Sequence, residues 1–397
     1  MSARTLAYSP FGEDSLRDPF PTYQALRDLD PVHAIAAHDG WALSRFADVW
    51  AAAENAELFV TRAGTTAAQV LSRVEAPVPS VNQLDGADHT RLRKALHPFF
   101  ARHRIAALES EVRELARELL RSARGSEIDA AREFAEPVAA HVACRLLDLP
   151  RAEAPRFQRW VARYMTNAPG DLGRSPDALA AATEMNAWLA ERAAERRASA
   201  VRGGTVIDCL LEARIDDRAL ADLEIASHLQ TLVIGGTETT PKVVSAALLR
   251  LYENPEQRAA VLAADASASD AFEEALRLDM PTQFMARTLA RDTELHGKKL
   301  RAGQGVLLLY ASANRDEREF PEPDRFEVRR RPKRMLGFGH GAHLCLGLHV
   351  ARLEGRVLLE ELLARAPHYQ VDVGHVARVA SDQMRGIASL PIRLNSA

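Results

Sequence analysis

The longest stretch of unbroken helical periodicity in this chain spans residues 222–252. A single helix of that length would measure about 46 Å, so it would cross the whole molecule and other elements would pack around it. Its middle, however, is poor helix sequence. Pro241 cannot donate to the carbonyl of Thr237, and Gly235 and Gly236 each cost about 1 kcal/mol relative to alanine. Some other interaction must offset that local cost.

Helix-forming residues also dominate the rest of the chain. Residues 105–123 and 184–200 are rich in Ala, Leu, Glu and Arg at helical spacing. The clearest strand-like runs are short and cover residues 40–43 and 305–310. No internal repeat or Gly/Ser-rich linker divides the chain. We therefore expect a mainly α-helical fold with a smaller β-rich region, built as one domain over residues 1–397.

Charge and hydropathy argue against nucleic-acid and membrane partners. The 397 residues include 51 basic and 54 acidic side chains, and a formal net charge of −3 creates no field that favours nucleic acid. The first residues contain no apolar signal region, and polar residues interrupt each apolar stretch before the ~20 residues that a membrane span needs. We therefore expect a cytoplasmic protein.

The three cysteines are Cys144, Cys209 and Cys345, with no Cys-x-x-Cys pair, so the sequence indicates neither a disulfide framework nor a structural zinc site. Cys144 and Cys209 lie in apolar helical contexts and are expected in the core. Cys345 instead follows a glycine-punctuated loop and precedes a helical run over residues 349–364. Backbone N–H groups and the helix dipole stabilise a thiolate at such a position, although an isolated cysteine there is more often simply buried.

The pattern around Cys345 is more specific. Residues 338–347 read Phe-Gly-His-Gly-Ala-His-Leu-Cys-Leu-Gly. This resembles the haem-binding signature of the cytochrome P450 family, which is Phe, two residues, Gly, three residues, Cys, one residue, Gly. The resemblance implies the mainly α-helical P450 fold around haem b (iron protoporphyrin IX), with Cys345 as the axial iron ligand and Phe338 packed beside it. Gly341 and Gly347 are expected to let the backbone approach the flat cofactor.

A second motif lies upstream, where Glu274 and Arg277 are spaced as in the family's Glu-x-x-Arg. Alone, such an i,i+3 pair would be a surface contact worth a few tenths of a kcal/mol. In the family the pair is buried and closed by a further arginine. Residues 323–326 resemble the family's Pro-x-Arg-Phe and offer Arg325 at the matching position, with Arg330 as the less favoured substitute. We expect Glu274, Arg277 and Arg325 to form a structural ion network that supports the haem loop.

The weak centre of the long helix is the third point of resemblance. Residues 235–239 read Gly-Gly-Thr-Glu-Thr, which is similar to the family segment whose acid and alcohol lie over the haem beside the dioxygen groove. The hydroxyl of Thr239 can donate to the carbonyl of Gly235 and hold that groove open, and Glu238 can pass protons from solvent. Glu238 and Thr239 are therefore the expected catalytic pair, with Gly235 at the cofactor. The alternative is a solvent-facing Glu beside a capping Thr.

The haem propionates need countercharges, because a buried carboxylate without a partner costs on the order of several kcal/mol. His89 and Arg93 are spaced i,i+4 and so share one helix face. Both match family positions that bind propionate, as do Arg287 and, within the cysteine loop, His343. Arg91 is expected on the exposed face of the same helix.

Substrate contacts are predicted only by region. The candidate segments are residues 62–82, 165–167, 282–285 and 384–387. Within them the individual candidates are Met165, Thr282, Gln283 and Phe284. The mixture of polar and apolar side chains at 282–284 fits a substrate that needs one orienting hydrogen bond, and ordinary core packing is the alternative for each residue.

The resemblance implies a haem-thiolate monooxygenase that inserts one oxygen atom from O2 into a small or medium apolar organic substrate. Its two electrons would come from an iron–sulfur ferredoxin and an NAD(P)H-dependent ferredoxin reductase. The basic run 329–334 is either an ordinary solvated stretch or the place where Arg331, Lys333 and Arg334 dock that partner. Two alternatives stay open: a peroxide-using haem-thiolate enzyme, which Glu238 disfavours, and a haem-binding sensor without turnover.

Overall fold

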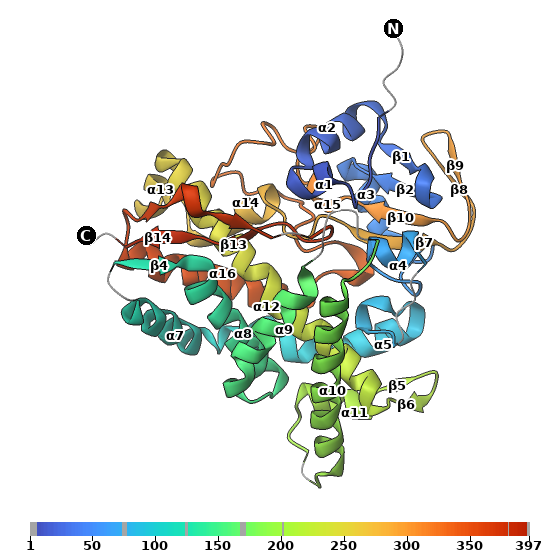
Figure 1. The fold of residues 1–397 in the computed structure, drawn as a ribbon, viewed down its shortest axis with the longest axis horizontal. Coiled ribbons are helices and arrows are strands. Elements are labelled where there is room, and N and C mark those ends of the chain that lie inside the picture. The colour runs from blue at the N-terminus through green and yellow to red at the C-terminus, as the bar shows by residue number, and fades with distance from the viewer. Residues whose placement is uncertain are drawn as a thin grey trace.

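The computed structural model describes residues 6–73, 78–123, 126–166, 172–200, 202–379 and 381–394. Helices make up most of it, and the strands form small sheets (Figure 1). The helices in chain order are α1 (Glu13–Arg17), α2 (Phe20–Leu29), α3 (Phe46–Glu54), α4 (Ala67–Leu71), α5 (Gly86–Leu96), α6 (Arg102–Ala106), α7 (Glu109–Ser122), α8 (Glu136–Leu147), α9 (Ala154–Met165), α10 (Pro176–Ala198), α11 (Val206–Glu212), α12 (Asp222–Glu253), α13 (Pro255–Leu262), α14 (Ala268–Leu278), α15 (Tyr310–Ala313) and α16 (Leu348–Arg365). The expectation of a mainly α-helical fold is confirmed.

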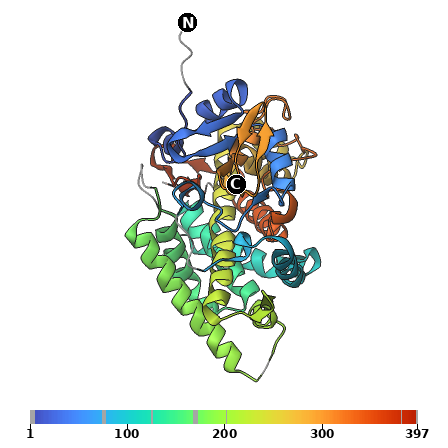
Figure 2. The same ribbon diagram turned by 90° about the vertical axis from the view of Figure 1, so that its right-hand side faces the viewer.

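The predicted long helix is α12, which runs without a break and ends one residue beyond the expected boundary. It contacts α8, α9, α10, α14 and α16, and Figure 2 shows it passing through the molecule beside α10. Around Pro241 the C-terminal half of α12 is almost wholly buried. Two threonine hydroxyls in its weak centre donate to carbonyls of the preceding turn, Thr237 to Val233 at 2.8 Å and Thr239 to Gly235 at 3.2 Å.

The largest sheet joins strands from distant parts of the chain. Its order is β1-β2-β10-β7-β3, with the bounds Val32–Ile35 (β1), Gly40–Leu43 (β2), Phe59–Val60 (β3), Met285–Leu289 (β7) and Gly305–Leu308 (β10). Strand β10 runs parallel to β2 and antiparallel to β7. Gly40 and Gly305 face each other in the parallel pair, where a side chain at Gly40 would come within 2.4 Å of Leu71 in α4 and one at Gly305 within 3.0 Å of Val70. Glycine therefore lets α4 lie directly on the sheet.

The other strands form four smaller sheets. They are β11 (Gln370–Val371), β14 (Pro391–Arg393) and β4 (Glu127–Asp129) in one sheet, and the pairs β12 (Ala377–Arg378) with β13 (Ile387–Ser389), β5 (Arg214–Ile215) with β6 (Arg218–Ala219), and β8 (Thr293–Leu295) with β9 (Lys298–Leu300). Among the described residues, no helix combines the length and apolarity needed to cross a bilayer.

Two predicted helices differ from the observed ones at their boundaries. The predicted helix 105–123 is interrupted after α6, and a new helix, α7, begins at Glu109. The predicted helix 184–200 is the second part of α10, which starts eight residues earlier than expected. The start of α10 has a local cause, because the Ser175 side chain accepts the N–H of Ala178 and Pro176 occupies the first helical position.

A buried ion network joins α14 to the segment that leads into the cysteine loop. The Arg277 side chain is fully buried, and its Nε and Nη2 donate to the two carboxylate oxygens of Glu274 at 2.9 and 2.7 Å. Its Nη1 donates to the backbone carbonyls of Asn314 and Pro323. The side-chain oxygen of Asn314 in turn accepts the N–H of Leu336 at 2.8 Å. The pair therefore fixes the backbone just ahead of the loop.

The third member of this network was predicted wrongly. The side chain of Arg325 is exposed and pairs with Glu322, so only its backbone carbonyl reaches Arg277. Arg330 closes the network instead, with its Nε 3.0 Å from Glu274 Oε1. The reason is a turn in which the N–H of Arg325 donates to the carbonyl of Glu322. That turn leaves the Arg325 side chain in solvent, and the chain returns to Glu274 five residues later.

This difference gives a matched test. Arg330→Ala should lower the free energy of unfolding by about 2–3 kcal/mol, because it removes one charge-assisted bond to a buried carboxylate and three bonds to backbone carbonyls. Arg325→Ala should change it by less than about 0.5 kcal/mol, since it breaks only exposed pairs. Urea unfolding of both variants measures the difference. Equal losses in the two variants would contradict the assignment of Arg330 to the network.

Candidate functional site

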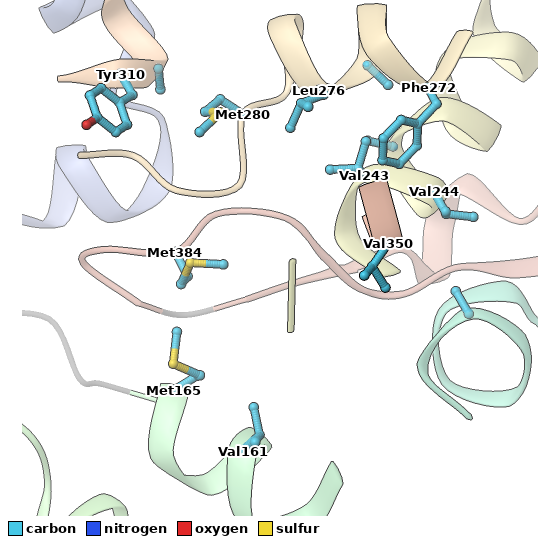
Figure 3. Close-up of a cluster of buried hydrophobic side chains, with 14 of the residues drawn as sticks. Val161, Met165, Val243, Val244, Phe272, Leu276, Met280, Tyr310, Val350 and Met384 are labelled. Atoms are coloured by element: carbon cyan, nitrogen blue, oxygen red, sulfur yellow. The ribbon is translucent and has the colours of Figure 1, made fainter. Parts of the chain in front are cut away.

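A cavity of about 330 Å³ lies between α5, the middle of α12, the segment after α14 and the start of α16. This volume is within the usual range for small-molecule sites. Its walls are mainly apolar, and Figure 3 shows several of the side chains that contribute: Val243, Phe272, Leu276, Met280, Tyr310 and Val350. The polar and ionisable lining residues are Thr65, Asn82, His89, Arg93, Thr231, Thr239, Thr240, Thr282, Arg287, His343, Cys345 and Glu354.

Cys345 ends the loop before α16, and its side chain lines the cavity. Its backbone N–H donates to the carbonyl of Phe338 at 2.9 Å, which fixes the loop. Burial raises the pKa of the Cys345 thiol, whereas the N–H of Gly347 and the guanidinium groups of Arg93 and Arg352 lower it. Arg352 also lies 4.9 Å from the centre of the Phe338 ring. Burial has the largest effect, so the pKa of the free thiol is raised overall, although the neighbouring N–H and guanidinium groups favour the anion.

The glycines at the site serve different purposes. A side chain at Gly235 or Gly347 would meet no atom within 4 Å, so these two positions leave room for a flat group to approach the backbone. The expectation for Gly341 was wrong. Its φ is +71°, and a side chain there would collide with the carbonyl of Ala53 at the end of α3. Gly341 does not line the cavity, and glycine is required there because the loop packs on α3.

The four predicted propionate ligands come together at the cavity. The rings of His89 and His343 stack with centroids 4.1 Å apart, and Arg93 and Arg287 line the same space. Burial lowers the pKa of His89, assisted by Arg93. Burial followed by the charge of Arg287 lowers the pKa of His343 to about 2. Within the described part of the chain none of the four forms an ion pair, and His89 Nε2 is buried without a hydrogen bond.

These observations test whether the residues fit haem. Two guanidinium groups and two imidazoles, buried or half-buried and without carboxylate partners among the described residues, suit two buried propionates. A thiol that lines the cavity suits an iron ligand. Gly235 and Gly347 leave the space that a porphyrin face requires. The donor set, its charge and the apolar walls therefore all fit the group expected from the sequence.

The expected catalytic pair is only partly directed at the cavity. Thr239 lines it, and its hydroxyl makes the predicted bond to the carbonyl of Gly235 at 3.2 Å. Glu238 is buried, but its side chain is not part of the lining. Its Oε1 lies 3.6 Å from the Nζ of Lys242, one turn along α12. Burial raises the pKa of Glu238 to about 7, against the opposing charge of Lys242.

The four substrate candidates have different outcomes. Thr282 lines the cavity. The predictions for Gln283 and Phe284 were wrong, because both side chains are buried in the core, and the amide of Gln283 donates to the carbonyl of Met280. Met165 is also buried outside the lining, in the apolar cluster that includes Met384 (Figure 3).

Of the candidate regions, residues 62–82 contribute Thr65, Val81 and Asn82 to the cavity. Residues 74–77 of that region, and Asn167 of the second region, lie outside the described residues. No residue of 384–387 lines the cavity, although Met384 bridges to Thr282.

Sequence reasoning missed two buried ionisable residues near the site. Glu354 of α16 lines the cavity, neither of its oxygens has a hydrogen bond of normal geometry within the described residues, and burial raises its pKa to about 8. Lys242 of α12 is buried beside Glu238. In sequence both stand in helices among Leu, Val and Ala, and only the i,i+4 spacing of Glu238 and Lys242 carried a signal.

Comparisons with known proteins agree with this geometry. The family model described as cytochrome P450 matches residues 79–264 and 268–391. A vitamin D(3) 25-hydroxylase of Pseudonocardia autotrophica is 34% identical, over 95% of this chain and 94% of its own. A methyl-branched lipid omega-hydroxylase of Mycobacterium tuberculosis is 33% identical, over 90% and 85%. The crystal structure of CalO2 is similar with a TM-score of 0.85 and 30% identity, covering 98% of this chain and 99% of that one.

Removal of the positive charge of Arg287 is expected to have opposite effects on the haem-loaded and the haem-free protein. Arg287→Met should accelerate haem loss about 10- to 100-fold, because it removes a charge-assisted bond to a propionate. The same change should stabilise the haem-free protein, because it removes a buried charge that has no counter-ion among the described residues. Transfer of haem to an acceptor globin and thermal unfolding of the haem-free form measure the two effects. Arg91→Met, on the exposed face of α5, is the control, and a similar rate of haem loss from both variants would contradict the prediction.

Proposed function

This chain belongs to the cytochrome P450 family, and we propose that it inserts one oxygen atom from dioxygen into a small or medium apolar molecule. It is a monooxygenase, an oxidoreductase that uses haem. We also propose that residues 1–397 act as one catalytic domain. The observation that carries the proposal is a single, mainly apolar cavity whose lining includes both the thiol of Cys345 and the hydroxyl-bearing turn of α12 at Thr239.

In this proposal the Cys345 loop holds the cofactor. Cys345 would hold the haem iron through its thiolate, with Phe338 packed beside it, and Gly235 and Gly347 would allow close approach of the cofactor. When bound, thiolate-ligated haem supplies the activation of dioxygen. His89, Arg93, Arg287 and His343 would hold the propionates. None of the four has a counter-ion in the part of the chain that the structure describes, which supports this role.

Thr239 and Glu238 manage protons on the α12 side of the cavity. The Thr239 hydroxyl already donates to Gly235, so its oxygen is held at the cavity wall, ready to accept a hydrogen bond. A carboxyl whose pKa is about 7 is close to half-protonated at neutral pH, which is the condition in which an acid both gives and regains protons efficiently. Glu238 therefore supplies protons to the cavity, and the Thr239 hydroxyl provides the hydrogen-bonding group at the cavity wall.

The cavity supports an apolar substrate with one polar anchor. Most of the lining is hydrocarbon, while Thr65, Asn82 and Thr282 place hydrogen-bonding groups around it. The amide of Asn82 is itself held by Thr65 at 3.4 Å and by Ser80. The relatives named as hydroxylases of vitamin D(3) and of methyl-branched lipids agree with this class. We propose that Thr282 or Asn82 orients such a substrate.

The electron donor is proposed to be an iron–sulfur ferredoxin, reduced by an NAD(P)H-dependent reductase in the cytoplasm. A groove outside the Cys345 loop is lined by Arg331, Lys333, Arg334 and Leu344. Two of these cations are engaged, Arg331 with Asp270 at 2.8 Å and Arg334 with Glu319 at 2.6 Å. Lys333 is exposed and makes no ion pair within the described residues. It is therefore the cation most available to an acidic partner.

The proposed reaction is tested by measuring NADH consumption and product formation separately. With ferredoxin, reductase and NADH, Thr239→Ala and Glu238→Gln should each lower the yield of oxidised product per NADH about 10-fold or more, with hydrogen peroxide formed instead. Thr237→Ala is the matched control. The Thr237 hydroxyl also donates to the carbonyl four residues earlier, but Thr237 does not line the cavity. If neither site variant changed the ratio of product to peroxide, the proposed proton pathway would be wrong.

Partner docking makes a salt-dependent prediction. Lys333→Glu should slow reduction of the haem about 10-fold at low ionic strength, with the difference shrinking at high salt. Lys299→Glu changes the same charge on the exposed hairpin β8–β9 and is the control. Stopped-flow reduction by the ferredoxin measures both rates. Equal rates for the two variants at low salt would place the docking surface elsewhere.

A further inference from the structure

Lys242 is a buried lysine shared by two carboxyl groups. Its Nζ lies 3.0 Å from Oε1 of Glu136 and 3.6 Å from Oε1 of Glu238. The side chains of Lys242 and Glu238 are 5% and 10% exposed, whereas that of Glu136 is 25% exposed. The three groups therefore form a short row that starts at the surface with Glu136 and ends inside with Glu238, beside Thr239 of the cavity wall.

The packing around Lys242 limits where its ammonium group can go. Gly386, in the loop before β13, lies so close that a side chain there would come within 2.7 Å of the Lys242 Cβ and 2.9 Å of its Cγ. This contact holds the stem of the lysine against α12. Glu136 is fixed in the first turn of α8. Small rotations at the end of the lysine chain are therefore enough to favour one carboxylate over the other.

The charges in this row do not balance. Two carboxylates and one ammonium group leave one negative charge in a largely buried place, so a proton is taken up there more readily than in water. Burial raises the pKa of Glu238 to about 7, Lys242 opposes the rise, and Glu136 adds to it. Burial also opposes the charge on Lys242, but the two carboxylates raise its pKa overall, so the lysine stays an ammonium ion.

Other charged groups nearby are occupied elsewhere. In the turn before α8, Arg132 donates to the carbonyl of Ala388 and Glu133 accepts the N–H of Asp129. The buried carboxyl of Glu354 approaches α12 from α16 at Thr240, and it does not contribute to the charge felt by Glu238. Glu136 and Lys242 are thus the groups that set the state of Glu238.

We propose that Lys242 is a positioning residue that alternates between Glu136 and Glu238 and so determines when Glu238 turns toward the cavity. The ionised Glu238 is held by Lys242, away from the cavity lining. When its carboxylate takes a proton from solvent that enters beside Glu136, the neutral group loses its attraction for the ammonium ion, and Lys242 moves fully to Glu136. This inference rests on the proposed monooxygenase function.

The released Glu238 then rotates toward Thr239 and gives up its proton. One O–H bond of Glu238 breaks and one forms on the acceptor in the cavity, so the residue again carries a negative charge. Lys242 recaptures it, and the row is ready for the next proton from solvent. Lys242 keeps its own three protons throughout, and no electron is transferred. Glu238 therefore turns toward the cavity only when its carboxyl group carries a proton.

Two variants move the pKa of Glu238 in opposite directions. Glu136→Gln removes the charge that raises this pKa and leaves Lys242 to Glu238 alone, so the pKa should fall by about one unit. Lys242→Met keeps the length of the buried stem but removes the opposing charge, so the pKa should rise by about one unit or more. Infrared titration of the neutral carboxyl band in the haem-loaded protein, assigned with Glu238→Gln, measures both shifts without turnover.

The yield of product per NADH should follow the same shifts. Because the active form of Glu238 is protonated, the yield falls as pH rises through its pKa, and this fall should move to lower pH in Glu136→Gln and to higher pH in Lys242→Met. Asp222→Asn, which changes a charge at the start of the same helix, should move neither. An unaltered carbon monoxide difference spectrum confirms that the haem site of each variant is intact.

The outcomes separate this inference from the proposed function. If the infrared shifts are absent, the three groups are not coupled and the inference fails, whatever the enzyme oxidises. If the shifts occur but the pH dependence of the yield stays unchanged, the inference also fails, while the monooxygenase function stands. If the wild-type protein forms no product with any electron donor, the proposed function fails and Lys242 has no delivery step to control.

Discussion

A cluster of arginine and imidazole side chains that has no counter-ion among the described residues constrains the whole molecule. Arg93 from α5, Arg287 from β7 and His343 from the cysteine loop converge on one wall of the cavity. Removing a guanidinium group from water costs on the order of several kcal/mol. The fold therefore carries an electrostatic cost that an anionic cofactor removes, so cofactor binding and folding stability are linked. The buried carboxyl groups near the cavity, Glu238 and Glu354, belong to other helices, α12 and α16, and form no ion pair with this cluster among the described residues.

The parts of the site that the sequence predicted are those set by local geometry. The spacing of His89 and Arg93 places both on one face of a helix, and both line the cavity. The hydroxyl of Thr239 finds the carbonyl four residues earlier because any helix brings the two together. The position of Cys345 before a helix follows from the loop pattern. The fold class followed from helical periodicity and from the resemblance of these motifs.

The parts that could not be predicted depend on tertiary packing. Whether Arg325 or Arg330 reaches Glu274 is decided by a turn whose direction no periodicity encodes. Adjacent residues of an irregular segment point in different directions, so Thr282 faces the cavity while Gln283 enters the core. The burial of a charged residue within a helix depends on the neighbouring helices, which is why the environment of Lys242 emerged only from the structure.

The parallel pairing of β2 with β10 has a consequence for biosynthesis. Gly40 meets Gly305, which leaves the ribosome about 265 residues later. At a translation rate of roughly 5–20 residues per second, this interval is on the order of 10–50 s. During it, β1 and β2 can form only their local hairpin, with one edge of β2 unpaired and open to other extended chains. The sheet nearest the N-terminus is thus completed late in synthesis, and until then the nascent chain carries an open strand edge.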